Sequence, residues 1–239
     1  DDYQVAIQIT RCLAKAIDHD MTEGHELAKL LMQRNELMVR RAMADVLTRL
    51  FRRLGDDALP FYYQLRDDSD SDILAAVSTT SADLRFLDVD MWAENLVELS
   101  NHELPVVRRN LVPSLREYFE TFPDDTRKLL PVMWQDGDEV VRTRMRELLI
   151  KMSDISSTQF GARITDLNQH GCDLSALWRL MDARRKGSSE AWKSWLSGEG
   201  EMPETIETMR HVSTMQAPEE LPDLSEALET LDEELGFLD

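Results

Sequence analysis

The chain has few of the residues that build disulfides, tight phosphate-binding turns or membrane spans. Its 239 residues include only two cysteines and nine glycines. Cys12 and Cys172 are too few for a disulfide framework, and this scarcity favours a reducing compartment. The sequence has neither a G-x-S-x-G motif nor a glycine-rich phosphate loop, which argues against nucleotide-binding and nucleophile-elbow sites.

Long hydrophobic runs are also missing. No stretch reaches the roughly 18 consecutive apolar residues that a membrane-spanning helix needs. The opening residues "DDYQVAIQIT" lack the basic-then-apolar order of a signal peptide. Because 42% of the residues are hydrophobic, the chain can bury an ample core. We therefore expect a cytoplasmic protein without a membrane contact.

Basic side chains are outnumbered by acidic ones. There are 27 lysines and arginines against 46 aspartates and glutamates, which gives a net charge of −19. This balance argues against nucleic acid as the partner, because duplex binding draws affinity from cations that neutralise phosphates. Residues 199–239 hold thirteen acidic residues against the single Arg210, a net of −12, which leaves −7 for residues 1–198. The C-terminal segment thus carries most of the imbalance.

Residues that could carry chemistry do not form a recognisable site. His170 and Cys172 have ligand-like spacing, but no Cys-x-x-Cys or His-x-x-x-His pair accompanies them. Paired acids such as Asp67 and Asp68 stand in polar segments, where helix capping and solvation explain them. We therefore expect no metal, no cofactor and no enzymatic activity.

A 34-residue period organises most of the chain. Apolar residues, with Ser81 as the one exception, recur at this period in three successive positions, each four residues after the last. These ladder residues are Val5, Val39, Ile73, Val107 and Val141; Ile9, Met43, Val77, Leu111 and Met145; and Leu13, Leu47, Ser81, Leu115 and Leu149. Side chains four apart share one face of a helix, so each unit predicts an amphipathic helix of about thirteen residues.

A second apolar group in each unit predicts a partner helix, so that the unit forms a hairpin. The groups are Leu27, Leu30 and Leu31; Phe61, Tyr62 and Leu65; Leu96, Val97 and Leu99; and Leu129, Leu130 and Met133. Polar segments such as "RDDSDS" and "QDGDE" separate the two helices and are typical of turns and N-caps. In "LLPVMWQDGDEVVRTRMRELL" the Asp-Gly-Asp is therefore predicted to be the hairpin turn.

This order of Leu-Leu-Pro, apolar helix, Asp-containing turn and Val-Arg resembles the HEAT repeat family over roughly residues 1–175. The residues that carry the resemblance are Leu129, Leu130, Pro131, Asp136, Val141 and Arg142, with Asn101, Val107, Arg108, Val39 and Arg40 in other units. Leu74 and Ala6 replace the arginine in two units. The tetratricopeptide family shares the period, but its Trp, Leu-Gly and Tyr landmarks are not in register.

The resemblance implies a right-handed α-solenoid that binds protein partners, with the second helix of each hairpin lining the concave face. It also implies that Arg40, Arg108 and Arg142 pair with Asp or Asn groups of the turns. We therefore predict an all-α fold, an α-solenoid of stacked antiparallel hairpins with an acidic C-terminal helix. Residues 1–182 would form the array and a capping helix, 183–220 a linker with a tryptophan-containing helical segment, and 221–239 the acidic helix.

Cations on the second helices are the first candidate binding surface. They lie on the face away from the ladder and would align into a basic strip when hairpins stack. The strip comprises Arg41, Arg49, Arg52, Arg53, Arg109, Arg116, Arg144 and Lys151. The alternative is that these cations only form salt bridges with Asp45, Glu117 and Glu147 on neighbouring turns.

Two further segments are candidate contacts. Trp192 and Trp195 share one side of a helical turn, where they either pack on the last hairpin or form a binding anchor. Near the C-terminus, leucines at helical spacing predict an acidic amphipathic helix: Leu224, Leu228, Leu231 and Leu235. This helix could dock on its own solenoid, enter a partner's groove or cover the basic strip.

These patterns favour a non-enzymatic scaffold or adaptor that binds a protein partner. The first alternative is a HEAT-like nucleic-acid-binding or repair-associated protein that uses the basic strip on phosphates. The second is an enzyme related to the HEAT-like lyases that attach chromophores, for which the chain shows no nucleophile or acid pair.

Overall fold

The computed structural model describes residues 2–205, and this range is helical nearly throughout, with no strand. The α-helices are α1 (Asp2–His19), α2 (Met21–Met32), α3 (Leu37–Leu54), α4 (Leu59–Arg66), α5 (Ser71–Thr80), α6 (Val89–Ser100), α7 (Pro105–Thr121), α8 (Pro123–Trp134), α9 (Glu139–Ile155), α10 (Ser157–Gln169), α11 (Ser175–Arg184) and α12 (Ser188–Leu196). Short 3-10 helices follow α3 (Gly55–Ala58) and α5 (Ser81–Phe86). The all-α prediction is confirmed for these residues. The predicted helix at 221–239 lies outside them.

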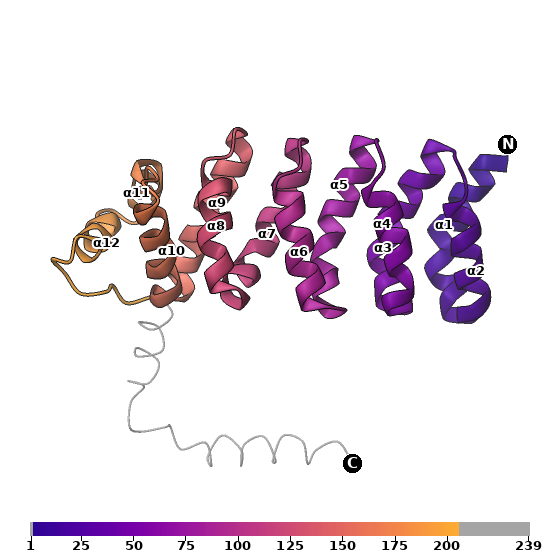
Figure 1. Cartoon of the computed structure of the whole chain (residues 1–239), viewed down its shortest axis with the longest axis horizontal. Coiled ribbons are helices and arrows are strands. Elements are labelled where there is room, and N and C mark those ends of the chain that lie inside the picture. Colours follow the sequence, from indigo (N-terminus) through magenta and orange to yellow (C-terminus); the bar gives the residue numbers. More distant parts are fainter. Residues whose placement is uncertain (1, 206–239) are drawn as a thin grey trace, which may run out of the picture.

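The helices form antiparallel pairs that follow one another in a single row (Figure 1). The odd-numbered helices pack in series, α1 on α3, α3 on α5, α5 on α7 and α7 on α9. The even-numbered helices form the other side of the row, where α8 contacts both α6 and α10. The hydrophobic core runs continuously between the two sides. None of the helices in the described range combines the length and apolarity needed to cross a membrane.

The predicted ladder is buried in four of its five units. All ladder residues of α3, α5, α7 and α9, together with Ser81 just after α5, are buried, as the 34-residue period requires. In α1 the prediction is confirmed for Leu13 but wrong for Val5 and Ile9, which are 56% and 37% exposed, and the helix buries Ala6 and Thr10 instead. The reason is position: α1 ends the row, and no described helix precedes it to cover that face.

Two residues of the predicted partner-helix groups are also exposed rather than buried. Leu30 of α2 and Val97 of α6 point away from the core, while their neighbours Leu31 and Leu96 face it. A helix of the even-numbered side buries one stripe only, so a run of adjacent apolar residues cannot all be covered. Exposed valines and leucines on this side are therefore available for contact.

The Asp-Gly-Asp segment is the turn of a hairpin, as predicted. The side chain of Asp138 caps α9 by accepting hydrogen bonds from the amides of Val140 and Val141, at 3.1 and 3.0 Å. Asp70 caps α5 in the same way. An N-cap carboxylate satisfies amides that have no partner within the helix, and its charge suits the positive end of the helix dipole.

Residues 183–205 contain the predicted tryptophan-containing helical segment, which is α12, and residues 206–220 of the predicted linker lie outside the described residues. The predicted boundary falls inside α11, and α12 packs on α10 and α11. Trp192 is only 4% exposed, and its ring stands edge-on to Phe160 with 4.6 Å between centroids. The hydroxyl of Ser157 bonds the Pro203 carbonyl, which holds the following segment against α10. Burial of the tryptophan side chain explains why this segment joins the array.

Candidate partner-binding surfaces

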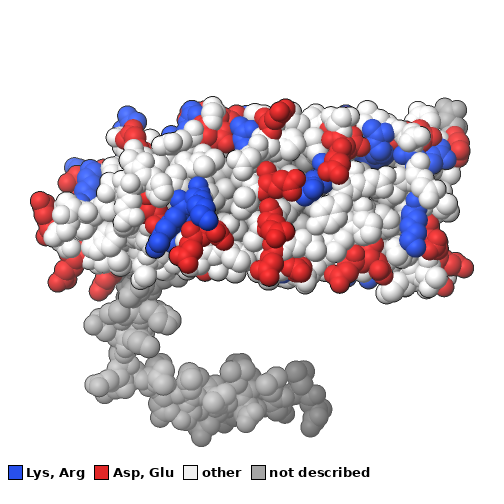
Figure 2. Space-filling view, in the orientation of Figure 1, with Lys and Arg blue, Asp and Glu red and all other residues white. Residues whose placement is uncertain are grey.

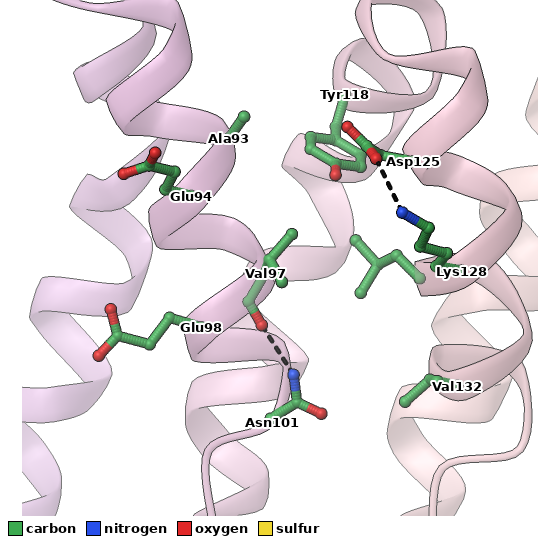
Figure 3. Close-up of a pocket in the computed structure, with 10 residues that line it drawn as sticks. Ala93, Glu94, Val97, Glu98, Asn101, Tyr118, Asp125, Lys128 and Val132 are labelled. Atoms are coloured by element: carbon green, nitrogen blue, oxygen red, sulfur yellow. Dashed lines mark hydrogen bonds and ion pairs between the residues drawn. The ribbon is translucent and has the colours of Figure 1, made fainter.

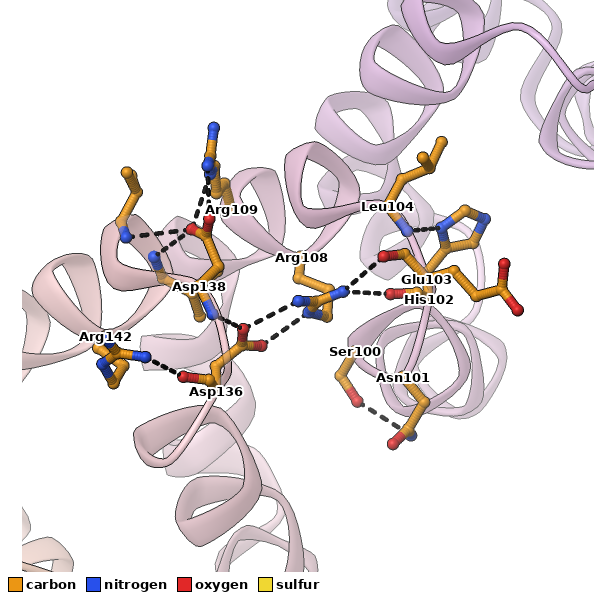
Figure 4. A network of polar contacts seen from close by, with 12 residues as sticks. Ser100, Asn101, His102, Glu103, Leu104, Arg108, Arg109, Asp136, Asp138 and Arg142 are labelled. Carbon is orange, nitrogen blue, oxygen red and sulfur yellow. Dashed lines mark hydrogen bonds and ion pairs between the residues drawn. The ribbon is translucent and has the colours of Figure 1, made fainter.

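Two adjacent arginines of α7 hold the turn that precedes α9 (Figure 4). Arg108 forms a bidentate ion pair with Asp136, in which Nε donates to Oδ2 at 2.7 Å and Nη2 donates to Oδ1 at 2.9 Å. Arg109 does the same with Asp138, its Nε lying 2.8 Å from Oδ1. Asp136 also accepts the Asp138 amide at 2.7 Å, so both carboxylates are fixed inside the turn. One hairpin is thereby joined to the next at two points.

The same arrangement joins α3 to the turn before α5. Arg40 donates to Asp68 and Arg41 to Asp70, each at 2.7 Å, and Asp68 accepts the Asp70 amide. We call each set of two arginines and two aspartates an arginine–aspartate clamp. The predicted pairing of Arg40 and Arg108 with turn aspartates is confirmed.

The third arginine of this prediction, Arg142, is held differently. It donates to the carbonyl oxygen of Asp136 and forms an ion pair with Glu139 of its own helix. Its partner in the turn is therefore a backbone oxygen rather than a carboxylate. Arg142 closes the turn of its own hairpin and does not reach the next one.

The clamps shift the acidity of their aspartates. The hydrogen bond from Arg109 lowers the pKa of Asp138, and the one from Arg41 lowers the pKa of Asp70. Burial acts to raise the pKa of Asp136, but hydrogen bonds from Arg108 and the Asp138 amide outweigh it and lower the pKa. All three carboxylates are therefore stabilised in the charged form that the arginines bind.

Several residues of the predicted basic strip are engaged within the fold. Arg41 and Arg109 belong to the clamps, and Arg53 pairs with Asp18 of α1 at 2.7 Å. Their partners are N-cap and neighbouring-helix aspartates, so the expected pairing with Asp45, Glu117 and Glu147 is wrong for them. Arg49 and Arg52 are exposed on α3. Three residues of the predicted strip are therefore already paired with carboxylates of this chain.

Three of the predicted residues converge in a groove between α7 and α9, which we call the α7/α9 groove. Arg116, Arg144 and Lys151 line this hollow of about 520 Å³. Apolar side chains lie between them: Val112, Pro113, Leu148 and Ile155. Arg116 pairs with Glu120 at 3.0 Å and Arg144 donates to the Arg109 carbonyl at 2.6 Å. Lys151 is exposed and has no ion pair among the described residues.

A second groove lies on the even-numbered side, between α6 and α8 (Figure 3). This α6/α8 groove has a volume of about 590 Å³. Val97 and Val132 face the gap from opposite helices and are 42% and 52% exposed, above a floor that includes Leu129 and Tyr118.

Charged residues form the rim of the α6/α8 groove. Glu94 and Glu98 lie on the α6 side, and on the α8 side Lys128 pairs with Asp125 at 3.6 Å. Figure 2 shows acidic side chains gathered over α6, next to cations over α8. The groove therefore combines an open apolar centre with a net acidic rim.

Sequence reasoning placed Val97 in the core and missed the α6/α8 groove. A signal was present, since Val97 and Val132 stand 35 residues apart, close to the repeat period. They occupy matching places in successive first helices, but neither belongs to the ladder that identified the buried face. An apolar residue that repeats off the buried stripe is expected on the exposed side of its helix rather than in the core.

The remaining candidate residues have structural surroundings. Trp192 is buried, as in the packing interpretation, and Trp195 is partly covered beside it, with 5.7 Å between ring centroids. Burial raises the pKa of the Cys172 thiol, which accepts from Gln135. Within residues 2–205 no group of three or more His, Cys, Asp or Glu is placed to hold a metal ion. The candidates Leu224, Leu228, Leu231 and Leu235 lie outside the described residues.

Neither a protein-family model nor a curated protein matches this chain.

Proposed function

We propose that the chain is a HEAT-like α-solenoid that acts in the cytoplasm as a non-enzymatic scaffold or adaptor for a protein partner. Support comes from the series of hairpins, the 34-residue ladder and the clamps between successive units. Stacked hairpins of this kind bury one continuous core and leave long surfaces free for binding. The acidic C-terminal segment docks on this array or on the partner.

The observation that carries the proposal is the α6/α8 groove. Val97 and Val132 expose apolar surface on both sides of one hollow, and the charged rim surrounds them. Protein interfaces combine an apolar centre with a polar rim in this way. A partner would place an apolar side chain between the two valines and a basic group near Glu94 or Glu98. The partner-binding surface thus lies on the even-numbered side rather than along the predicted basic strip.

Nucleic-acid binding through the basic strip is the alternative function. The clamps already occupy Arg41 and Arg109, and Arg53 is paired with Asp18. Fewer cations therefore remain for phosphates than the sequence suggested, within a chain of net charge −19. Phosphate contacts make affinity fall steeply with salt, whereas apolar contacts do not. Salt dependence therefore separates the two functions.

The test is affinity capture from native lysate with three forms of the full chain: wild type, a Val97→Asp and Val132→Asp double variant, and Val140→Asp. Val140 is 39% exposed on α9 and lines neither groove, so Val140→Asp makes the same kind of change, one carboxylate in place of an exposed valine, outside both grooves. We expect the same proteins with wild type and Val140→Asp, at low and high salt and after nuclease treatment. The groove double variant should lose them.

Two results would contradict the proposal. One is unchanged capture by the groove double variant. The other is capture that disappears with nuclease and falls steeply with salt, which would support the nucleic-acid alternative. Circular dichroism and thermal melting of each variant establish that lost capture does not come from unfolding.

A further inference from the structure

We propose that residues 221–239 of the chain occupy the α7/α9 groove of the same molecule. This inference rests on the C-terminal docking named in the proposed function and chooses both the occupant and its place. It does not depend on the α6/α8 groove, which is tested separately by affinity capture with the Val97→Asp and Val132→Asp double variant.

The described chain ends beside this groove. Thr205 and Ile155 line one small hollow at the end of α9, and Ile155 also lines the α7/α9 groove. The hydroxyl of Ser157, at the start of α10, donates to the Pro203 carbonyl and so holds the end of the described chain close to this point. Residues 206–220 can reach up to about 50 Å when extended, at roughly 3.3–3.6 Å per residue. The 17 residues of α9 span only about 25 Å, so this connection is long enough.

Charge decides between the two grooves. Residues 221–239 carry seven acidic residues and no basic one: Asp223, Glu226, Glu229, Asp232, Glu233, Glu234 and Asp239. The α6/α8 groove has Glu94 and Glu98 on its rim and would repel such a segment.

The α7/α9 groove offers the opposite charge. It presents Arg116, Arg144 and Lys151 against two acids, Glu147 and Asp154. Arg185 pairs with Asp154 at 3.1 Å and Glu120 pairs with Arg116 at 3.0 Å, so these two outside partners offset each other and the groove keeps one more cation than acids. Opposite charge suits the acidic segment to this side of the row.

Apolar surface and length also match. As a helix, residues 221–239 would align their four leucines in one stripe, suited to the apolar side chains between the cations. Leu224 and Leu235 are eleven positions apart, as are Arg144 and Ile155, and in a helix this separation is a rise of about 16 Å. Exposed ion pairs are weak and are screened beyond about 8 Å at physiological salt, so the leucines must supply most of the affinity.

Carbodiimide cross-linking of the full chain tests the placement, because this reagent joins an amine directly to a carboxylate in contact with it. Peptide mapping by mass spectrometry should find Lys151 joined to carboxylates of residues 221–239. Lys128, exposed on the rim of the other groove, is the internal control and should give several-fold less of this product. A mixture of isotopically heavy and light chains should give products within single chains only.

Variants separate docking from mere tethering. Leu228→Ser with Leu231→Ser should lower the Lys151 product several-fold. Met209→Ser with Met215→Ser, which removes apolar side chains from the connecting residues instead, should leave it unchanged. Equal labelling of Lys128 and Lys151, or no effect of the leucine changes, would overturn the proposal. Products that join heavy to light chains would also overturn it and identify a second copy as the occupant.

Discussion

Gly24, in the first turn of α2, lies directly against the backbone of Ile17 in α1. A β-carbon placed on Gly24 would stand 2.6 Å from the Ile17 Cα and 2.7 Å from its nitrogen. Both neighbours belong to a helix backbone, which cannot move aside as a side-chain tip can. The absence of a side chain at Gly24 therefore permits the close packing of α1 on α2.

Gly24→Ala should destabilise the protein by about 1–3 kcal/mol, because overpacking outweighs the roughly 1 kcal/mol that alanine gains over glycine in a helix. The measurement is urea unfolding followed by circular dichroism. Gly137→Ala is the matched control, since a β-carbon there meets nothing within 4 Å and the backbone has no positive φ. If both variants kept wild-type stability, the described approach of α1 and α2 would be incorrect.

Breaking an arginine–aspartate clamp should lower the stability of the fold. Asp136→Ala leaves the guanidinium of Arg108, only 15% exposed, without its carboxylate, and we expect a loss of about 3 kcal/mol. Glu120→Ala removes the exposed partner of Arg116 and should cost only about 0.3–0.5 kcal/mol. A double-mutant cycle between Arg108 and Asp136 measures their coupling directly. Additive effects in that cycle would mean that the two side chains do not interact.

The clamps should also make stability depend on pH in the acid range. Asp70 and Asp138 have lowered pKa values in the folded protein, so the unfolded chain binds protons more readily than the folded one. Their contribution is full above the unfolded pKa of about 3.9 and is lost as pH falls through the folded values. The urea concentration at the midpoint of unfolding should therefore stay constant between about pH 5 and 7 and decrease below about pH 4. Arg41→Gln with Arg109→Gln should flatten that fall; an equally steep fall would exclude the clamps as its source.

The burial of the ladder can be tested by making the same substitution at one ladder position in two different units. Val107→Asp buries an unpaired carboxylate and should cost several kcal/mol, against a total stability of about 5–15 kcal/mol for an ordinary domain. Val5→Asp makes the same change at the equivalent position of α1, where the side chain is 56% exposed, and should be nearly neutral. Thermal melting of the two variants compares them. Equal destabilisation by the two variants would contradict the exposure of the Val5 side chain on α1.

The repeat period was sufficient to predict the helices and most of the core. Val39, Ile73, Val107 and Val141 were all correctly placed, because burial on a helix follows its own spacing. The burial of Val5 was predicted wrongly, since it depends on whether a neighbouring helix covers the side chain and not on the sequence around Val5. Local pattern alone therefore cannot identify the residues at the end of a row.

The candidate surfaces were harder to predict for a related reason. The sequence pattern of an arginine on the outer face of a helix is the same whether the side chain is free or paired with a carboxylate. Arg109 finds Asp138 29 residues away, across the joint between two hairpins, and no local pattern indicates that partner. Arg116, Arg144 and Lys151 were identified from spacing, but their convergence depends on how α7 packs against α9.

The clamps occur at alternate joints of the row, and this gives the molecule an uneven mechanical stiffness. One clamp joins α3 to α5 and another joins α7 to α9. At the joint between them, α5 carries Leu74 and Ala75 where the arginines would stand. Hydrogen bonds from Asn110 to the Ala75 carbonyl and to the Ser78 hydroxyl cross that joint instead, together with an ion pair between Arg85 and Glu117.

Bending under load should therefore concentrate between α5 and α7. Both grooves lie across the clamped joint that follows, so their widths should stay constant while the two halves of the row flex. The molecule would then bend between two stiffer halves, with both grooves on the C-terminal half.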